Sequence, residues 1–126
     1  MTDHLARAHR IQMLTLDRVQ GEWVEYSDGD VLLRIRAVRA GADRRNASGD
    51  GDYVIHANDM DWLILAERLQ IDGVQIEPRP GATITPEKSE GVYEVTNGAS
   101  GNCFEWSDTR QVRLRIHTDK TLNVDA

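Results

Sequence analysis

The sequence predicts a mainly β fold: a small antiparallel β-barrel or sandwich with an N-terminal α-helix and one long mobile loop. Apolar and polar side chains alternate over several short segments, as in Val112, Leu114 and Ile116, and a period of two is that of a half-buried strand. Turn-forming dipeptides separate these segments. Several short strands joined by turns are typical of small barrels and sandwiches.

The chain of 126 residues is long enough for one domain with a modest core. We expect a single domain over residues 1–126. Residues 1–20 would contain the helix, residues 21–120 the barrel with a loop at 40–52, and residues 121–126 a polar tail.

Residues 3–18 have the features of an amphipathic helix. Asp3 can cap its N-terminus, and Leu5, Met13 and Leu16 fall on one side at helical spacing. A helix this short is marginally stable alone, so its apolar side is expected to pack on its own domain or on a neighbouring subunit.

The next segment, residues 22–38, is predicted to be a β-hairpin because two β-rich runs flank the turn signal Asp28-Gly29. Residues 40–52 follow as a polar loop that contains Arg44 and Arg45. This loop has no apolar residue larger than alanine, so it cannot bury enough surface to fix its own conformation.

Residues 53–69 admit two interpretations. The first is a strand, a kink at Asn58-Asp59, a second strand and one helical turn at Ala66 to Leu69. The second is a helix over residues 60–70, so the state of Trp62 to Leu69 stays open.

Three turn signals divide the rest of the chain: Asp72-Gly73, Pro80-Gly81 and Asn97-Gly98. A short strand is expected to start at residues 82–85, and residues 91–95 form the next one. The last predicted strand has Val112, Leu114 and Ile116 on its apolar side, which we expect to face the core.

The other side of this last strand is basic and is expected to face outward. It carries Arg113, Arg115 and His117. These side chains could be solvated or paired with acidic neighbours of the same chain, because charges are seldom fully buried. Alternatively, they could meet an acidic partner or another subunit.

The charge of the chain is unevenly distributed. Residues 20–109 contain 17 acidic and 8 basic side chains, a balance of −9, whereas residues 110–120 contain four basic and one acidic, a balance of +3. The formal net charge of the whole chain is −6. Proteins that bind nucleic acid present a broad positive surface, so this composition argues against a protein that holds DNA tightly.

Other function classes are disfavoured by composition. A single cysteine, Cys103, excludes an internal disulfide and fits a reducing cytoplasm. The longest apolar run, Trp62 to Ala66, is too short to span a membrane. Residues 1–10 lack the apolar segment of a signal peptide, so we expect synthesis in the cytoplasm and no membrane partner.

Candidate catalytic and metal-binding residues are few. The four histidines lack the spacing of a metal site, and no phosphate-binding glycine loop or nucleophile motif occurs. Asp59 and Asp61 would point the same way in a strand and could act as an acid/base pair, although Asp and Asn more often serve in caps and turns. We therefore expect no enzyme, no cofactor and no bound metal.

The order of these segments resembles the head–tail joining proteins of tailed bacteriophages and prophages. The most specific part is "WSDTRQVRLRIHT", from Trp106 to Thr118. The second is Asp61 to Ile84, which contains "DWLILAERL" and "PRPGATI". The loop at residues 40–52 takes no part in the resemblance.

The resemblance implies a small β-barrel that assembles into a homo-oligomeric ring, expected to be a hexamer, at the head–tail neck of the virion. Such a ring closes the filled head, contacts portal or adaptor and tail proteins, and lets DNA pass nearby without specific binding. The residues that we expect at subunit or partner contacts are Leu5, Met13, Leu16, Arg44, Arg45, Trp106, Arg113 and Arg115.

Two alternatives stay open at this point. A tail terminator or an adaptor protein would show the same sequence features. A cytoplasmic small binding domain, or an enzyme that uses Asp59, Asp61 and His56, is the alternative from a different class. Portal, terminase and tail genes beside this gene would favour the virion protein.

The charge distribution yields a prediction about DNA. At a net charge of −6 the protein should show no measurable duplex binding at physiological salt, because nonspecific binding depends on contacts between basic side chains and phosphates. A titration with duplex DNA at low and moderate salt, on free and assembled protein, measures this. Tight binding by the assembled form with a steep salt dependence would point instead to a nucleic-acid-binding module.

Overall fold

A computed structural model of the chain describes residues 7–12, 14, 20–41, 59–98 and 101–121. The strands are β1 (Glu22–Asp28), β2 (Val31–Ala40), β3 (Asp59–Leu65), β4 (Gln70–Ile71), β5 (Val74–Gln75), β6 (Thr83–Pro86), β7 (Val92–Val95), β8 (Phe104–Trp106) and β9 (Arg113–Thr121). One 3₁₀ turn, η2 (Ala66–Arg68), follows β3. None of the helical segments in this described part has the length and apolarity that a membrane crossing requires.

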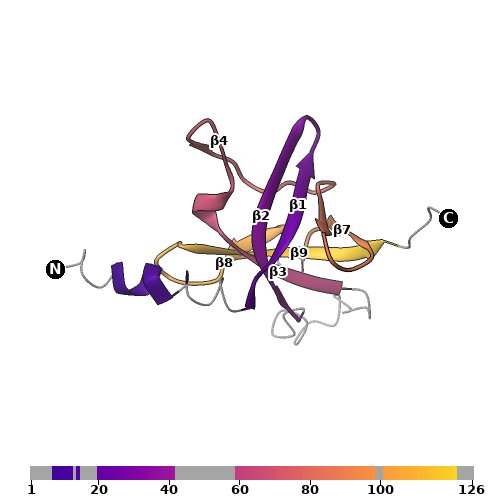
Figure 1. The fold of residues 1–126 in the computed structure, drawn as a ribbon. Coiled ribbons are helices and arrows are strands. Elements are labelled where there is room, and N and C mark those ends of the chain that lie inside the picture. The colour runs from indigo at the N-terminus through magenta and orange to yellow at the C-terminus, as the bar shows by residue number, and fades with distance from the viewer. Residues whose placement is uncertain (1–6, 13, 15–19, 42–58, 99–100, 122–126) are drawn as a thin grey trace.

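Six strands close into an antiparallel barrel, which resolves the choice between barrel and sandwich. Their order is β3-β2-β1-β6-β7-β9, and β9 pairs back with β3. The short strand β8 adds to β9 beside β7, and β4 and β5 form a separate hairpin. In Figure 1 the β1–β2 and β4–β5 hairpins both project from the top of the barrel, whereas the N-terminal helix lies at its lower left.

The predicted hairpin around Asp28-Gly29 is confirmed. β1 and β2 pair from Glu22↔Ala37 to Asp28↔Val31, and the turn between them places Gly29 at a φ of 61°. That left-handed conformation is accessible to glycine at no steric cost, and it matches the twist of the two strands.

The segment at residues 59–69 is a strand followed by a helical turn, as the first interpretation held, and the alternative helix over residues 60–70 is wrong. β3 pairs with β2 on one side and with β9 on the other. Its residues from Asp61 to Leu65 are all buried. Because both faces of this strand are covered, its sequence is a continuous apolar run that periodicity alone cannot distinguish from a helix.

Two of the other predicted turn signals, Asp72-Gly73 and Pro80-Gly81, also mark turns. Asp72 and Gly73 have φ angles of 54° and 82° between β4 and β5, and Gly81 has a φ of 96° before β6. β6 begins one residue later than expected. The predicted loop at residues 40–52 and the predicted tail at residues 121–126 each lose their first residue to a strand. Ala40 is the last residue of β2, and Thr121 is the last residue of β9. The remaining residues of both segments lie outside the described residues.

The core fills the barrel with apolar side chains from every wall. On β9 the expected core residues Leu114 and Ile116 are 1% and 0% exposed, whereas Val112 precedes the strand and is only half-buried. The other fully buried large side chains are Trp62, Tyr26, Ile64, Leu65, Leu69, Ile84, Val24 and Val95.

His117 lies on the outer side of β9, as its alternation with Leu114 and Ile116 predicts, but it is not exposed there. His117 is buried, and Arg113 and Arg115 are half-buried rather than fully solvated. The reason is that β9 has strand neighbours on both edges, so side chains of β3 and β8 flank its outer side.

Substitution of Leu114 by Asp should destroy the fold. The carboxylate would be buried without a partner, which costs several kcal/mol and approaches the whole stability of a small domain, about 5–15 kcal/mol. We expect insoluble protein, or a melting transition lost from the circular dichroism signal. Arg110→Asp, at an exposed position four residues away, is the matched control and should melt like the wild type. Soluble Leu114→Asp protein with an unchanged melting temperature would contradict this core.

Candidate functional site

A buried cluster of charged side chains lies on the outer side of β3 and β9. Its centre is Asp61, whose side chain is 3% exposed. Nη1 of Arg115 donates to one carboxylate oxygen at 2.7 Å, and Nδ1 of His117 lies 3.0 Å from the other. The β3–β9 register sets Asp61 directly opposite His117. Because both carboxylate oxygens have charged or polar partners, the cluster locks the two strands together.

The His117 ring is enclosed on its other side as well. Its Nε2 atom is buried, forms no hydrogen bond within the described residues, and lies 3.6 Å from a carboxylate oxygen of Glu105 on β8. A Cβ atom at Gly98 would come within 2.7 Å of the ring, so the backbone of the segment after β7 packs directly on it. Burial disfavours the charged ring, but the hydrogen bond and the charge of Asp61, with Glu105, outweigh it and raise the pKa of His117.

Arg115 also reaches the end of β2. The Nη1 atom that binds Asp61 donates to the carbonyl oxygen of Gly41 at 3.1 Å. One guanidinium therefore joins β9, β3 and the last described residue before position 42. This contact fixes the point at which the chain leaves β2.

Arg113 lies one step along the same side of β9 and is held by Ser107. Nε of Arg113 donates to Oγ of Ser107 at 3.2 Å, and that hydroxyl donates to the carbonyl oxygen of Arg113 at 3.0 Å. Trp106 of β8 is opposite Leu114 in register and packs against the core. Of the predicted contact residues, Trp106, Arg113 and Arg115 thus lie on the neighbouring strands β8 and β9. Trp106 faces the core, whereas the two arginines lie on the other side of the sheet.

The other predicted contact residues, Leu5, Met13, Leu16, Arg44 and Arg45, lie outside the described residues, as does His56.

Arg113 and Arg115 make contacts within the subunit, with Ser107 and Asp61 respectively. Replacing both arginines with acidic residues would therefore affect folding as well as assembly. A carboxylate in place of Arg115 would face the buried Asp61.

Asp108 organises the turn that leads into β9, a role that the sequence analysis missed. Its carboxylate accepts backbone N–H bonds from Arg110 at 3.1 Å, Val112 at 3.1 Å and Arg113 at 2.9 Å. Burial opposes its charge, but the N–H groups of Arg113 and Val112, together with His9, hold the pKa of Asp108 below its usual value. The Ser-Asp pair before a short polar run was the available signal, since Asp side chains often bond to the backbone a few residues onward.

The same turn anchors the N-terminal helix. Residues 7–12 are helical, as expected. Nε2 of His9 lies 2.9 Å from Oδ2 of Asp108, and Arg10 makes a bidentate ion pair with Glu67 of η2, both bonds 2.9 Å long. The helix is therefore attached to the barrel through two different elements.

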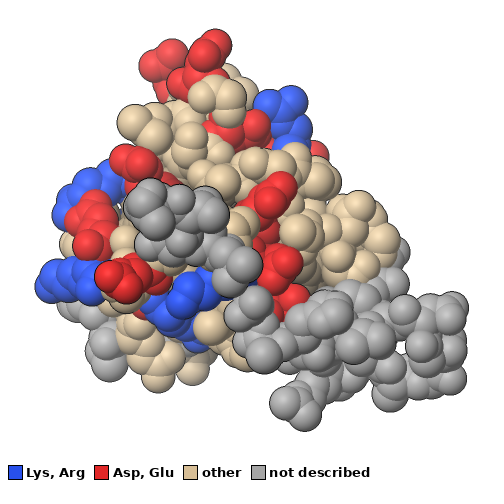
Figure 2. Space-filling model, turned by 90° about the vertical axis from the view of Figure 1, so that its right-hand side faces the viewer, with Lys and Arg blue, Asp and Glu red and all other residues tan. Residues whose placement is uncertain are grey.

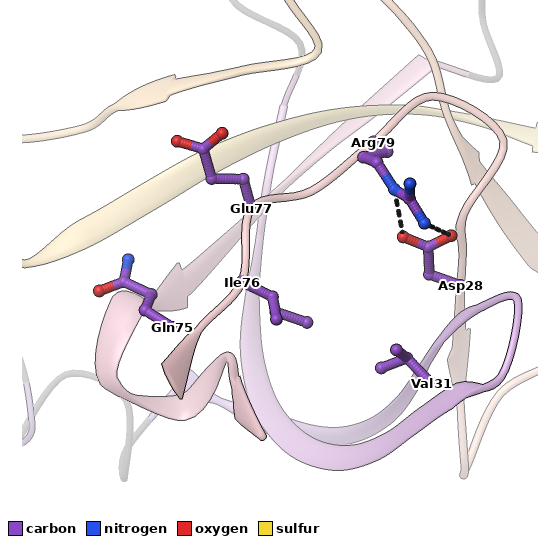
Figure 3. Close-up of a pocket in the computed structure, with 6 residues that line it drawn as sticks. All are labelled: Asp28, Val31, Gln75, Ile76, Glu77 and Arg79. Atoms are coloured by element: carbon purple, nitrogen blue, oxygen red, sulfur yellow. Dashed lines mark hydrogen bonds and ion pairs between the residues drawn. The ribbon is translucent and has the colours of Figure 1, made fainter. Parts of the chain in front are cut away.

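A second feature is an open groove of about 560 Å³ between the two projecting hairpins. Figure 3 shows Val31 and Ile76 pointing toward each other across it, with Gln75 and Glu77 on one side and Asp28 and Arg79 on the other. Nε and Nη2 of Arg79 donate to the Asp28 carboxylate at 2.9 and 3.1 Å, so this pair closes one end of the groove.

Neither feature has the composition of a metal centre. Within the described ranges, no group of three or more His, Cys, Asp or Glu side chains is placed to hold a metal ion. Asp61 is occupied by Arg115 and His117, and burial raises the pKa of the Cys103 thiol, which donates to the Pro78 carbonyl oxygen. The geometry therefore favours a structural role for the cluster and a contact role for the groove.

Comparison with protein families decides the class of the chain. A family model described as "Phage head-tail joining protein" matches residues 2–125. The chain belongs to this family. Comparison with curated proteins and with solved structures gives no match. The match includes the two segments that carry the resemblance, Asp61 to Ile84 and Trp106 to Thr118. The second segment contains the Asp108 turn and most of β9 of this head–tail joining protein.

The buried cluster predicts a dependence of the stability of this head–tail joining protein on pH. Because the pKa of His117 is raised in the folded state, protonation of the ring stabilises the fold fully below its unfolded pKa of about 6.5. This contribution is lost as the pH rises through the higher folded-state pKa. The free energy of unfolding should therefore fall with pH in this window, and urea unfolding from pH 6 to pH 9 measures it.

The matched variant is His117→Gln, which should be less stable than the wild type at pH 6 and should lose this part of the pH dependence. The difference between the two proteins should narrow as the pH rises. A constant difference across the whole range would show that the ring does not change its charge there.

Proposed function

We propose that this protein forms a homo-oligomeric ring at the neck of a tailed-phage virion, closes the filled head, docks the tail and lets DNA pass. The observation that carries the proposal is the family match over residues 2–125. Membership makes the chain a structural component of the phage neck that interacts with head and tail components. The ring, its hexameric state and the closing of the head are the parts that we propose.

The arrangement of the barrel supports a protein that is held between neighbours. The anchored helix and the two projecting hairpins lie on different sides of the body (Figure 1). A rigid closed barrel keeps these two features at a fixed separation. A subunit of a ring needs such an arrangement, because it must present different surfaces to its two neighbours.

The charge pattern supports the passage of DNA without strong binding. Five arginines of the described residues are neutralised within the chain by the ion pairs Arg10–Glu67, Arg34–Glu87, Arg39–Glu22, Arg79–Asp28 and Arg115–Asp61. Acidic side chains are spread over the face shown in Figure 2. An excess of negative charge repels the DNA backbone, so a ring of such subunits would not retain the genome electrostatically.

The test is deletion of the gene from the phage that encodes it. We expect filled heads and free tails that fail to join, and restoration of complete virions by the wild-type gene supplied in trans. Leu114→Asp supplied in trans should fail, because its barrel does not fold, whereas Arg110→Asp should succeed.

Electron microscopy of purified virions then gives the axial position and copy number of the protein. A ring next to the portal supports head closure, whereas a ring at the end of the tail tube supports a tail terminator. Complete, infectious virions in the absence of the gene would contradict the proposal.

A further inference from the structure

The groove between the hairpins has an apolar floor and one apolar edge. Val31 and Ile76 are partly buried and pack against the core. Val74, which precedes the lining residue Gln75 on the β4–β5 hairpin, is 66% exposed. It is one of the four large apolar side chains that are exposed among the described residues. An exposed apolar side chain at the edge of an apolar groove indicates a contact surface. Leu32 is also exposed, but it alternates with Val31 along β2 and lies on the face of that strand opposite to the groove.

The rim of the groove is acidic. Asp30 and Asp72 are exposed in the two hairpin turns, and Glu77 is exposed on the wall. Arg79 is paired with Asp28, so it cancels that charge and leaves the other three carboxylates in excess. Figure 2 shows acidic side chains at the top of the molecule, at the height of the hairpin turns in Figure 1. A partner for this groove should therefore be apolar in the middle and basic at the edge.

The helical segment at residues 7–12 has these two properties. Arg7 and Ile11 are one turn apart on the same side, both are exposed, and Ile11 is 54% exposed. His9 and Arg10 instead contact Asp108 and Glu67 of the barrel. The anchored helix thus presents an arginine and an isoleucine outward.

We infer that the groove of one copy accepts the Arg7–Ile11 side of the helix of a second copy. Ile11 would pack beside Val74 over the floor formed by Val31 and Ile76, and Arg7 would meet the acidic rim. Amphipathic helices commonly bind in apolar grooves through anchors spaced by three or four residues. The helix and the two hairpins that flank the groove occupy different parts of the subunit (Figure 1), so the contact joins two different surfaces, is head-to-tail and can close into a ring. The inference rests on the proposed ring and names its subunit contact.

Single substitutions measured by sedimentation velocity on the purified full chain test the apolar part. Ile11→Glu and Val74→Glu should each weaken self-association at least tenfold, because a carboxylate would enter an apolar, acidic contact. The matched control is Val92→Glu, since Val92 on β7 is the fourth exposed large apolar side chain and lies outside this surface. Val92→Glu should associate like the wild type, and all three variants should keep the wild-type melting temperature.

A charge exchange tests the electrostatic part. Arg7→Glu should weaken association, and the addition of Glu77→Arg in the same chain should restore most of it. Cysteines placed at Ile11 and Gln75 together should form disulfide-linked ladders, whereas either cysteine alone should not. The native Cys103 is buried and should not contribute.

The outcomes separate this inference from the proposed function. Rings that form normally in Ile11→Glu and Val74→Glu overturn the contact and leave the ring standing. Normal rings that fail to attach heads or tails would assign the groove to another virion protein and likewise overturn the inference. A wild-type chain that is present as a single copy in virions would overturn both.

Discussion

The pairing of β3 with β9 is the constraint on which the rest of the structure depends. It joins the middle of the chain to its end through seven residue pairs, from Asp59↔Asp119 to Leu65↔Arg113. This pairing closes the barrel, and it produces two different environments. Toward the inside, Trp62 and Ile64 pack with Leu114 and Ile116 in the core. Toward the outside, the same register brings Asp61 to Arg115 and His117.

The electrostatic consequence is that five arginines of this acidic protein form ion pairs with carboxylates of the same chain. A buried carboxylate such as Asp61 is stable only with charged or hydrogen-bonding partners, and β9 supplies both. Near the surface, ion pairs such as Arg34–Glu87 contribute little to stability, but they reduce the positive charge available to a phosphate. In the neck role that we propose, this arrangement limits the attraction between the subunit and passing DNA.

The barrel also fixes the relation between the two features that project from it. Asp108 ties the helix to the turn before β9 through His9, while the β1–β2 hairpin grows out of strands at the opposite wall. Loss of the Asp108 contacts would affect both the entry into β9 and the position of the helix. The position of the helix, which we propose as an assembly contact, therefore depends on the Asp108 turn of the same subunit.

Much of the fold could be predicted from the sequence because it is encoded locally. The alternation in β9 identified Leu114 and Ile116 as core, and glycine or Asp-Gly signals located the turns at Gly29 and Gly73. These features depend on backbone conformation and on neighbours within a few residues. The motif from Trp106 to Thr118 also pointed to the family. It was recognisable because its turn and its strand are formed by one uninterrupted segment of the sequence.

Tertiary structure alone decided the state of the apolar run after Asp59 and the roles of the charged residues. A strand covered on both faces has no period, so only its pairing with β2 and β9 distinguishes it from a helix. His117 alternates like a solvent-facing residue, yet it is buried because Asp61, Glu105 and Gly98 from three other segments surround it. The groove likewise joins residues near position 30 to residues near position 76. The sequence by itself determined the alternating strands, most of the turns and the family, whereas contacts between distant segments decided the state of β3, which polar side chains are buried and which apolar ones stay exposed.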